Sequence, residues 1–287
     1  MKNIIGLLLL IFIIDSYNTI KGQESDSIVR YLFAGHTSVT GHADKVDSRL
    51  ESMDMTEYTG VWLGGDLCIA TLVEYETLFY LDDIFDLDNP ETHWALGNHD
   101  YRNGNLVWYE EFTERPSYYA YSSNSITRVI LNTNLVPTQC DHINRQYKII
   151  KDVCDTIENS KHLFLIMHHG LYRNVPGLPI PAIVGHSDLV YWNSNCYDVN
   201  STFVNSIYPM LKEVKERGIN VYYLYGDMGS QMKSFDMMSE DSIRFLGCGL
   251  YYEDPFDKVM ILELNKNNFD LDIQFHNLDS LSNSISK

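Results

Sequence analysis

The chain has 287 residues, 45% of them hydrophobic, which is enough for one large domain with a substantial core. Lys and Arg total 21 against 39 Asp and Glu, giving a formal net charge of -18. A chain this acidic repels nucleic acid and anionic membrane surfaces, so we expect neither as a partner. A phosphate-bearing substrate would need a local cation to attract it.

The N-terminus has the form of a secretory signal peptide. Lys2 precedes an apolar run from Ile4 to Ile14, which is short for a membrane span, and a polar stretch follows. We therefore predict a signal peptide over residues 1–22 and one mature domain over 23–287, exported and without a stable membrane span. An uncleaved anchor is the alternative.

Apolar runs rich in β-branched and aromatic residues predict buried strands. These runs are Ile28–Phe33, Val61–Leu63, His93–Leu96, Leu163–Met167 and Val221–Tyr225. Apolar residues at helical spacing predict helices between them, over Ala70–Phe85, Ile143–Asn159 and Phe203–Arg217. This alternation favours a sheet covered by helices.

Two further stretches predict antiparallel hairpins, so we expect a mixed α/β fold. One hairpin turns around Ser122–Ser125, and the other turns at Asn265–Asn268. The segment Arg173–Asn200 is rich in Pro, Gly, Asn and aromatic residues and is predicted to be a long ordered loop.

Five cysteines are scattered along the chain without a CxxC motif. In an exported protein some of them are expected to pair, and Cys140 and Cys154 are the nearest in sequence. The odd count leaves at least one cysteine without an intramolecular partner. Cys68 and Cys248 lie in apolar surroundings typical of core residues.

Polar residues follow five of the predicted strands, each directly after the strand ends. They are His36 in "FAGHT", Asp66 in "LGGDLC", Asn98, His99 and Asp100 in "WALGNHD", His168 and His169 in "LIMHHG", and Asp227 in "LYGDMG". Ligands of α/β sheets bind beyond the carboxyl ends of strands, so these side chains are expected to converge. Carboxylate, imidazole and amide groups suit Zn, Mn, Fe or Mg.

These loops resemble, in order, those of the calcineurin-like metallophosphoesterases. Their pattern is DxH, GDxx, GNH[DE], an isolated His and GHxH, and "GGDLC" and "GNHD" match it closely. The resemblance covers about Ile28 to Asn277. It implies a four-layer α/β/β/α sandwich and hydrolysis of a phosphate ester by a metal-activated water.

Carried over residue by residue, the resemblance assigns a role to each matching side chain. Asp66 would bridge metals, and Asn98 and His168 would be metal ligands. His99 would donate a proton to the leaving alcohol, and Asp100 would orient His99 and fix its tautomer. In the third strand-ending loop, "GNHD" would thus bring together a ligand, an acid and the partner of that acid.

The chain departs from the pattern at both ends of the loop series. Ala34 stands where the family has the first Asp, Gly229 where it has the last His, and Asp227 replaces the first His of GHxH. One metal keeps Asp66, Asn98, His168 and Asp227, whereas the other keeps His36 and Asp66. We therefore expect one competent metal site and a doubtful second one, unless His42, His169 or another acid supplies a ligand.

The remaining assignments concern substrate and function. Arg102 and His169 are candidate substrate-binding residues, although His169 competes with His168 for the position of the isolated ligand. The sequence leaves three functions open. They are a phosphoesterase with one or two metals, a non-catalytic binding protein on the same fold, and a hydrolase of sugar chains or sulfate esters.

Overall fold

Two mixed sheets form the centre of the molecule. The computed structural model describes residues 27–39, 41–102, 104–179 and 202–282. The first sheet has the strand order β13-β12-β1-β4-β5. Its strands are β1 (Ile28–Ala34), β4 (Gly60–Leu63), β5 (His93–Trp94), β12 (Lys258–Asn265) and β13 (Leu271–Asn277). Because β1, β4 and β5 run parallel, their carboxyl ends lie at one edge of the sheet.

The second sheet has the order β10-β11-β9-β8-β7-β6. Its strands are β6 (Tyr119–Ser123), β7 (Ile126–Ile130), β8 (His162–Met167), β9 (Asn220–Tyr225), β10 (Ser234–Met238) and β11 (Arg244–Cys248). Strands β7, β8, β9 and β11 are parallel to their neighbours in this group. Every residue of β7 and β8 is buried, as expected for strands covered on both faces.

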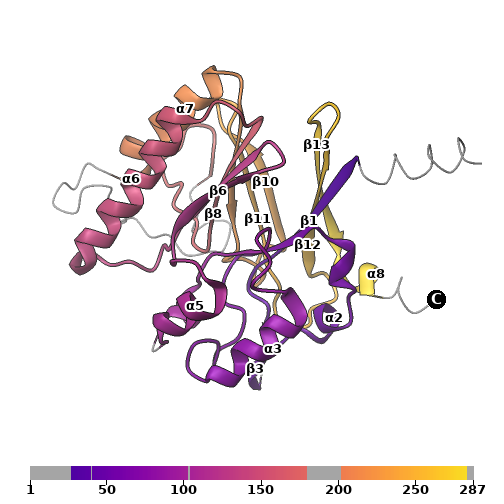
Figure 1. The fold of residues 1–287 in the computed structure, drawn as a ribbon. Helices are drawn as coiled ribbons and strands as arrows, with labels where there is room; N and C mark the ends of the chain where they lie inside the picture. Colours follow the sequence, from indigo (N-terminus) through magenta and orange to yellow (C-terminus); the bar gives the residue numbers. More distant parts are fainter. Residues whose placement is uncertain (1–26, 40, 103, 180–201, 283–287) are drawn as a thin grey trace, which may run out of the picture.

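Helices cover the outer face of each sheet, and the inner faces pack on each other (Figure 1). Residues from α6 (Cys140–Thr156) and α7 (Tyr208–Glu216) share one core with the second sheet. Residues from α2 (Ser48–Glu51), α3 (Tyr75–Phe85), α5 (Leu106–Thr113) and α8 (Leu278–Ser282) share another with the first sheet. The predicted four-layer mixed α/β architecture is confirmed.

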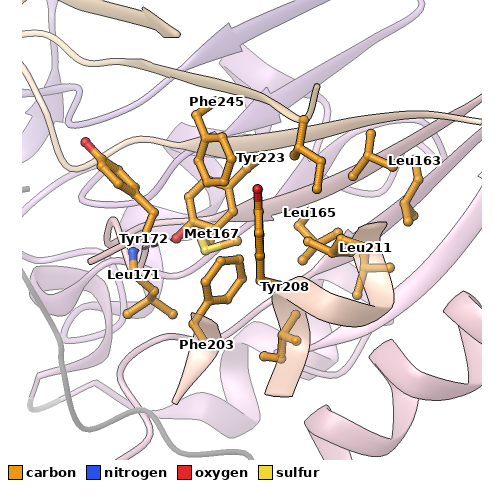
Figure 2. Packing of buried hydrophobic residues seen from close by; sticks show 14 of the residues in the cluster. Leu163, Leu165, Met167, Leu171, Tyr172, Phe203, Tyr208, Leu211, Tyr223 and Phe245 are labelled. Carbon is orange, nitrogen blue, oxygen red and sulfur yellow. Dashed lines mark hydrogen bonds between the residues drawn. The ribbon is translucent and has the colours of Figure 1, made fainter. Parts of the chain in front are cut away.

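Figure 2 shows how the second sheet meets its helices. Phe203, Tyr208 and Leu211 point from the helical side toward the side chains of β8 and β9. The rings of Phe203 and Tyr223 meet edge to face at 5.2 Å, and those of Tyr223 and Phe245 stack at 4.8 Å. Such aromatic pairs bury large apolar areas in fixed geometries, so they hold the strands that carry the polar loops.

The short elements complete the described chain. They are β2 (Ser38–Val39), β3 (His42–Val46), η1 (Met55–Glu57), α4 (Asn98–Tyr101), η2 (Pro137–Gln139) and η4 (Phe203–Ile207). No helix within the described ranges is long and apolar enough to cross a membrane. The predicted signal peptide lies outside the described residues, and so does most of the loop predicted at Arg173–Asn200.

Both predicted hairpins are present. Asn124 and Ser125, with φ of 49° and 59°, form the turn between β6 and β7, a conformation typical of tight hairpins. The second turn lies between Asn265 and Leu271, slightly beyond the predicted position.

Cys140 does not pair with Cys154, the nearest cysteine in sequence. Cys140 is disulfide-bonded, whereas Cys154 is free and lies on the buried face of α6. Its helical position turns Cys154 into the core, where it packs as a small apolar residue. Cys68 and Cys248 are also free and buried, as their surroundings predicted.

Candidate metal centre

The carboxyl ends of five parallel strands carry the polar residues that the sequence singled out. Strands β1, β4 and β5 are neighbours in the first sheet, and β8 and β9 are neighbours in the second. The residues that follow them are His36, Asp66, Asn98, His99, His168, His169 and Asp227. Loops from both sheets therefore meet at one end of the sandwich.

Glycines allow the two sheets to approach closely at this end. A Cβ atom on Gly35 would lie 2.5 Å from the Cα of Gly226, and one on Gly64 would lie 2.7 Å from that same atom. Any side chain here would force the strand ends apart. The approach brings His168 within hydrogen-bonding distance of the Gly64 carbonyl, which connects β8 to β4.

Asp100 holds two of the loops in place. Its buried carboxylate accepts hydrogen bonds from the backbone N–H of Asp66 at 2.7 Å, of Leu67 at 3.0 Å and of Gly97 at 2.8 Å. The indole N–H of Trp94 donates to it at 3.3 Å. These bonds hold Asp66 in a left-handed conformation with φ of 56°.

This arrangement corrects the predicted role of Asp100. The sequence suggested that Asp100 orients the His99 imidazole, but the hydrogen bonds of Asp100 within the described residues all go to other groups. Asp100 is N3 of helix α4, so its side chain turns back to bond the backbone at the helix start. These bonds are those of a residue that positions the Asp66 loop.

His168 has the features of a metal ligand. It is fully buried, and its Nδ1–H donates to the Gly64 carbonyl at 2.7 Å, which leaves Nε2 as the ring atom that faces the carboxylates. This Nε2 lies 3.4 Å from Asp66 Oδ2 and 4.0 Å from Asp227 Oδ1. It has no hydrogen-bond partner within the described residues, which is rare for a buried polar atom. A divalent cation fits this donor set.

The pKa values of these groups show how strongly they interact. Burial alone would lower the pKa of His168, but Asp66 and Asp227 raise it to about 10. Burial would raise the pKa of Asp66, yet His168 and His36 hold it below its usual range. Burial and the neighbouring His168 lower the pKa of His169 to about 3. The cluster thus prefers a positive charge between its carboxylates.

Asp66 also contacts His36 and His99. His36 donates from Nδ1 to the Leu250 carbonyl at 3.2 Å, and its Nε2 lies 3.8 Å from Asp66 Oδ2. The backbone N–H of His99 donates to Asp66 Oδ1 at 2.8 Å, and its Nε2 lies 4.0 Å from Asp66 Oδ2. The His99 side chain is 41% exposed, so a substrate can reach it.

The remaining predicted site residues are Asn98 and Arg102, at the two ends of α4, and Asp227, which follows β9. Asn98 begins α4 beside His99 and is half-buried. Arg102 ends α4 and is exposed. The backbone N–H of Asp227 donates to the His168 carbonyl at 2.9 Å, so this carboxylate is tied directly to the loop that carries both histidines.

His169, predicted as a substrate-binding residue, lies among the candidate metal ligands. Donor atoms of His168, His169 and Asp227 all lie within 4.8 Å of one another. Thr133 contacts the His169 ring, with 2.8 Å between its Oγ1 and Nδ1. The sequence analysis missed Thr133, although "LNTN" also places polar residues directly after a buried strand.

The chain lacks a ligand at two positions of the pattern that it resembles, for different reasons. Ala34 is the last residue of β1 and is fully buried, with no side-chain group that can bind a metal. Gly229 has φ of 113°, and a Cβ atom there would lie 2.3 Å from the Leu250 carbonyl oxygen. Position 229 therefore accepts no side chain. His42 is exposed on β3 and is not part of the buried group of His168, His169 and Asp227.

Comparison with known proteins supports the fold. No protein-family model matches the chain, and no curated protein matches its sequence. Among solved structures, a dimetal phosphatase from Danio rerio aligns with a TM-score of 0.52 at 8% identity, covering 87% of this chain and 96% of that one. This chain has a metallo-dependent phosphatase-like fold.

A second solved structure is the NAD nucleotidase of Haemophilus influenzae. It aligns at 11% identity and a TM-score of 0.45, with coverage of 86% of this chain and 49% of that chain. The alignment is too loose to support further inference. The likeness to the dimetal phosphatase, at 8% identity, shows the architecture alone.

Proposed function

We propose that this protein is a metal-dependent phosphoester hydrolase. The observation that carries the proposal is the buried His168 Nε2, which has no hydrogen-bond partner in the described chain and lies near two carboxylates. The arrangement occurs where five strand-ending loops meet in a phosphatase-like fold. Burying such a set of polar and charged side chains destabilises the fold unless a cation binds between them.

Asp66, Asn98, His168 and Asp227 would hold the ion, with His36 near Asp66. When bound, a divalent ion such as Mn, Fe, Zn or Mg polarises a phosphoryl oxygen and lowers the pKa of water. His99 donates a proton to the leaving oxygen, since its imidazole is accessible beside Asp66. Arg102, exposed at the end of α4, attracts the phosphate against the overall negative charge.

We further propose that one metal ion is held tightly. The second position of the family lacks its ligands at Ala34 and Gly229, and the backbone at Gly229 leaves no space for a replacement. His36 and Asp66 alone provide too few donors for a tightly bound ion.

Export completes the proposal. Residues 1–22 have the form of a signal peptide, and the disulfide at Cys140 is typical of an oxidising compartment.

The competing function is a binding protein that has lost catalysis. The same losses at Ala34 and Gly229 favour it, whereas the accessible His99 beside the donor set favours the hydrolase.

The test is hydrolysis of a generic aryl phosphate with Mn, Zn, Mg or Fe supplied. We expect His99→Ala to lower kcat by about 100-fold or more with metal content unchanged, because it removes a proton donor. Asp66→Ala should abolish both metal content and turnover. His142→Ala is the matched control, since it removes an exposed imidazole on helix α6 that contacts Tyr118. Equal activity in all four proteins would reject the hydrolase.

A further inference from the structure

His169 completes the metal ligand set, and we propose that it replaces the imidazole that the chain lacks at Asp227. This inference rests on the proposed metal centre. The family pattern supplies two imidazoles, one from the isolated His and one from GHxH, and the second is a carboxylate here. His169 lies next to His168 and within 4.8 Å of the donor atoms of His168 and Asp227.

The surroundings of His169 fit a ligand better than a substrate-binding residue. The side chain is buried, with 4% of the residue exposed, so its access to a bulky substrate is limited. Its ring meets the His168 ring edge to face, with the centroids 4.6 Å apart. Two buried imidazoles packed at right angles have little freedom to rotate away from each other.

Thr133 fixes the direction of the His169 ring. Its hydroxyl oxygen accepts the backbone N–H of His169 at 3.2 Å and lies 2.8 Å from Nδ1. A hydroxyl oxygen has two lone pairs, so we assign the second bond to Nδ1–H. This tautomer leaves the lone pair on Nε2, which is the arrangement of a metal-bound histidine held by an outer partner.

The replacement changes which metals the site prefers. With Asp227 as the substitute ligand alone, the donors would be mainly oxygen atoms and would favour Mg or another hard ion. Adding His169 provides two imidazole nitrogens beside the carboxylates of Asp66 and Asp227. Such a mixed set favours Zn, Mn or Fe over Mg.

The experiment measures metal affinity separately from turnover. The mature wild-type protein and its variants are titrated with Zn and with Mn against a competing chelator, and Co is added to record the visible absorption of the bound ion. We expect His169→Ala to weaken Zn binding at least about 100-fold and to shift the Co spectrum, because a nitrogen ligand is lost. Near-ultraviolet circular dichroism verifies that each variant is folded.

Thr133 offers a matched pair of variants. Thr133→Val removes the hydroxyl at nearly constant volume and should weaken Zn binding about 10- to 100-fold, whereas Thr133→Ser keeps the hydroxyl and should restore most of the affinity. Unchanged Zn affinity in His169→Ala, with loss of binding in Asp66→Ala, would overturn the role of His169 and leave the proposed hydrolase intact. Absence of Zn and Mn binding in the wild type would overturn both.

Discussion

We propose that single residues determine which metal position this molecule keeps. His168 is buried with its Nε2 near two carboxylates, whereas Gly229 occupies a backbone conformation in which a side chain would collide with Leu250. The first feature would preserve a ligand, and the second removes the space for one. Restoring the family residue at 229 by substitution is therefore expected to fail.

The collision at Gly229 can be measured against Gly218, which also has a positive φ but has open surroundings. Gly218 has φ of 86° with nothing near its Cβ position, so Gly218→Ala tests the cost of the left-handed backbone alone, about 1 kcal/mol. Gly229→Ala adds a contact of 2.3 Å with a carbonyl oxygen and should cost about 3 kcal/mol or more. Urea unfolding gives both values, and equal losses would show that the collision is relieved without cost.

Asp100 is expected to act through Asp66. Asp100→Asn replaces an acceptor of four N–H groups with an amide that presents donors to some of them, so unfolding free energy should fall by about 3 kcal/mol. Zn affinity should also fall about 10-fold, because the Asp66 loop loses its support. Asp88→Asn, on an exposed loop, is the control. Unchanged stability and affinity would refute the positioning role.

Elements in this fold follow the hydrophobic pattern where tertiary contacts agree with it. Strands predicted at Ile28–Phe33 and Leu163–Met167 differ from β1 and β8 by one residue, because long apolar runs leave little choice. The helix predicted from Ala70 begins only at Tyr75. Thr71 bonds back to Cys68, and Ala70 pairs with Ala43, so this stretch turns before the helix starts.

The directions of side chains in the strand-ending loops could not be predicted from the sequence. The strand-ending rule located His36, Asp66, Asn98, His168 and Asp227 at one end of the sandwich. It could not tell which way neighbouring side chains turn, because that depends on backbone angles and on contacts with loops distant in sequence. The role of Asp100, the position of the His169 ring and the contribution of Thr133 therefore needed the structure.

The pairing of the two sheets buries a neutral histidine whose titration can be observed. Burial, with the charges of Arg128 and Arg115, lowers the pKa of His93 well below 6.5. The unfolded chain therefore binds a proton below pH 6.5 that the folded chain does not, so His93 makes stability fall as the pH falls from about 6.5 toward its folded pKa.

His93→Gln removes this one titration. Between pH 6.5 and 5.5 the wild type should lose about 1 kcal/mol more unfolding free energy than the variant. The measurement is urea unfolding of both proteins at several pH values, and the comparison uses slopes because the substitution itself changes the stability at every pH. Identical slopes would mean that folding does not lower the pKa of His93.

At the scale of the whole molecule, this chain and the dimetal phosphatase share an architecture at very low sequence identity. The alignment with the dimetal phosphatase covers 96% of that chain at 8% identity. The net charge of -18 disfavours the approach of phosphate esters unless a bound cation or local basic groups compensate it. A tightly bound divalent ion would therefore serve both attraction and chemistry at the one place where buried carboxylates and imidazoles meet.

We propose above all that this protein binds one functional metal ion. The most direct test is elemental analysis of the purified mature protein after dialysis against Zn or Mn and removal of free ions. We predict about one ion per chain in the wild type and almost none in Asp66→Ala, because that carboxylate lies between His36, His99 and His168. Two ions per wild-type chain, or none, would contradict the account.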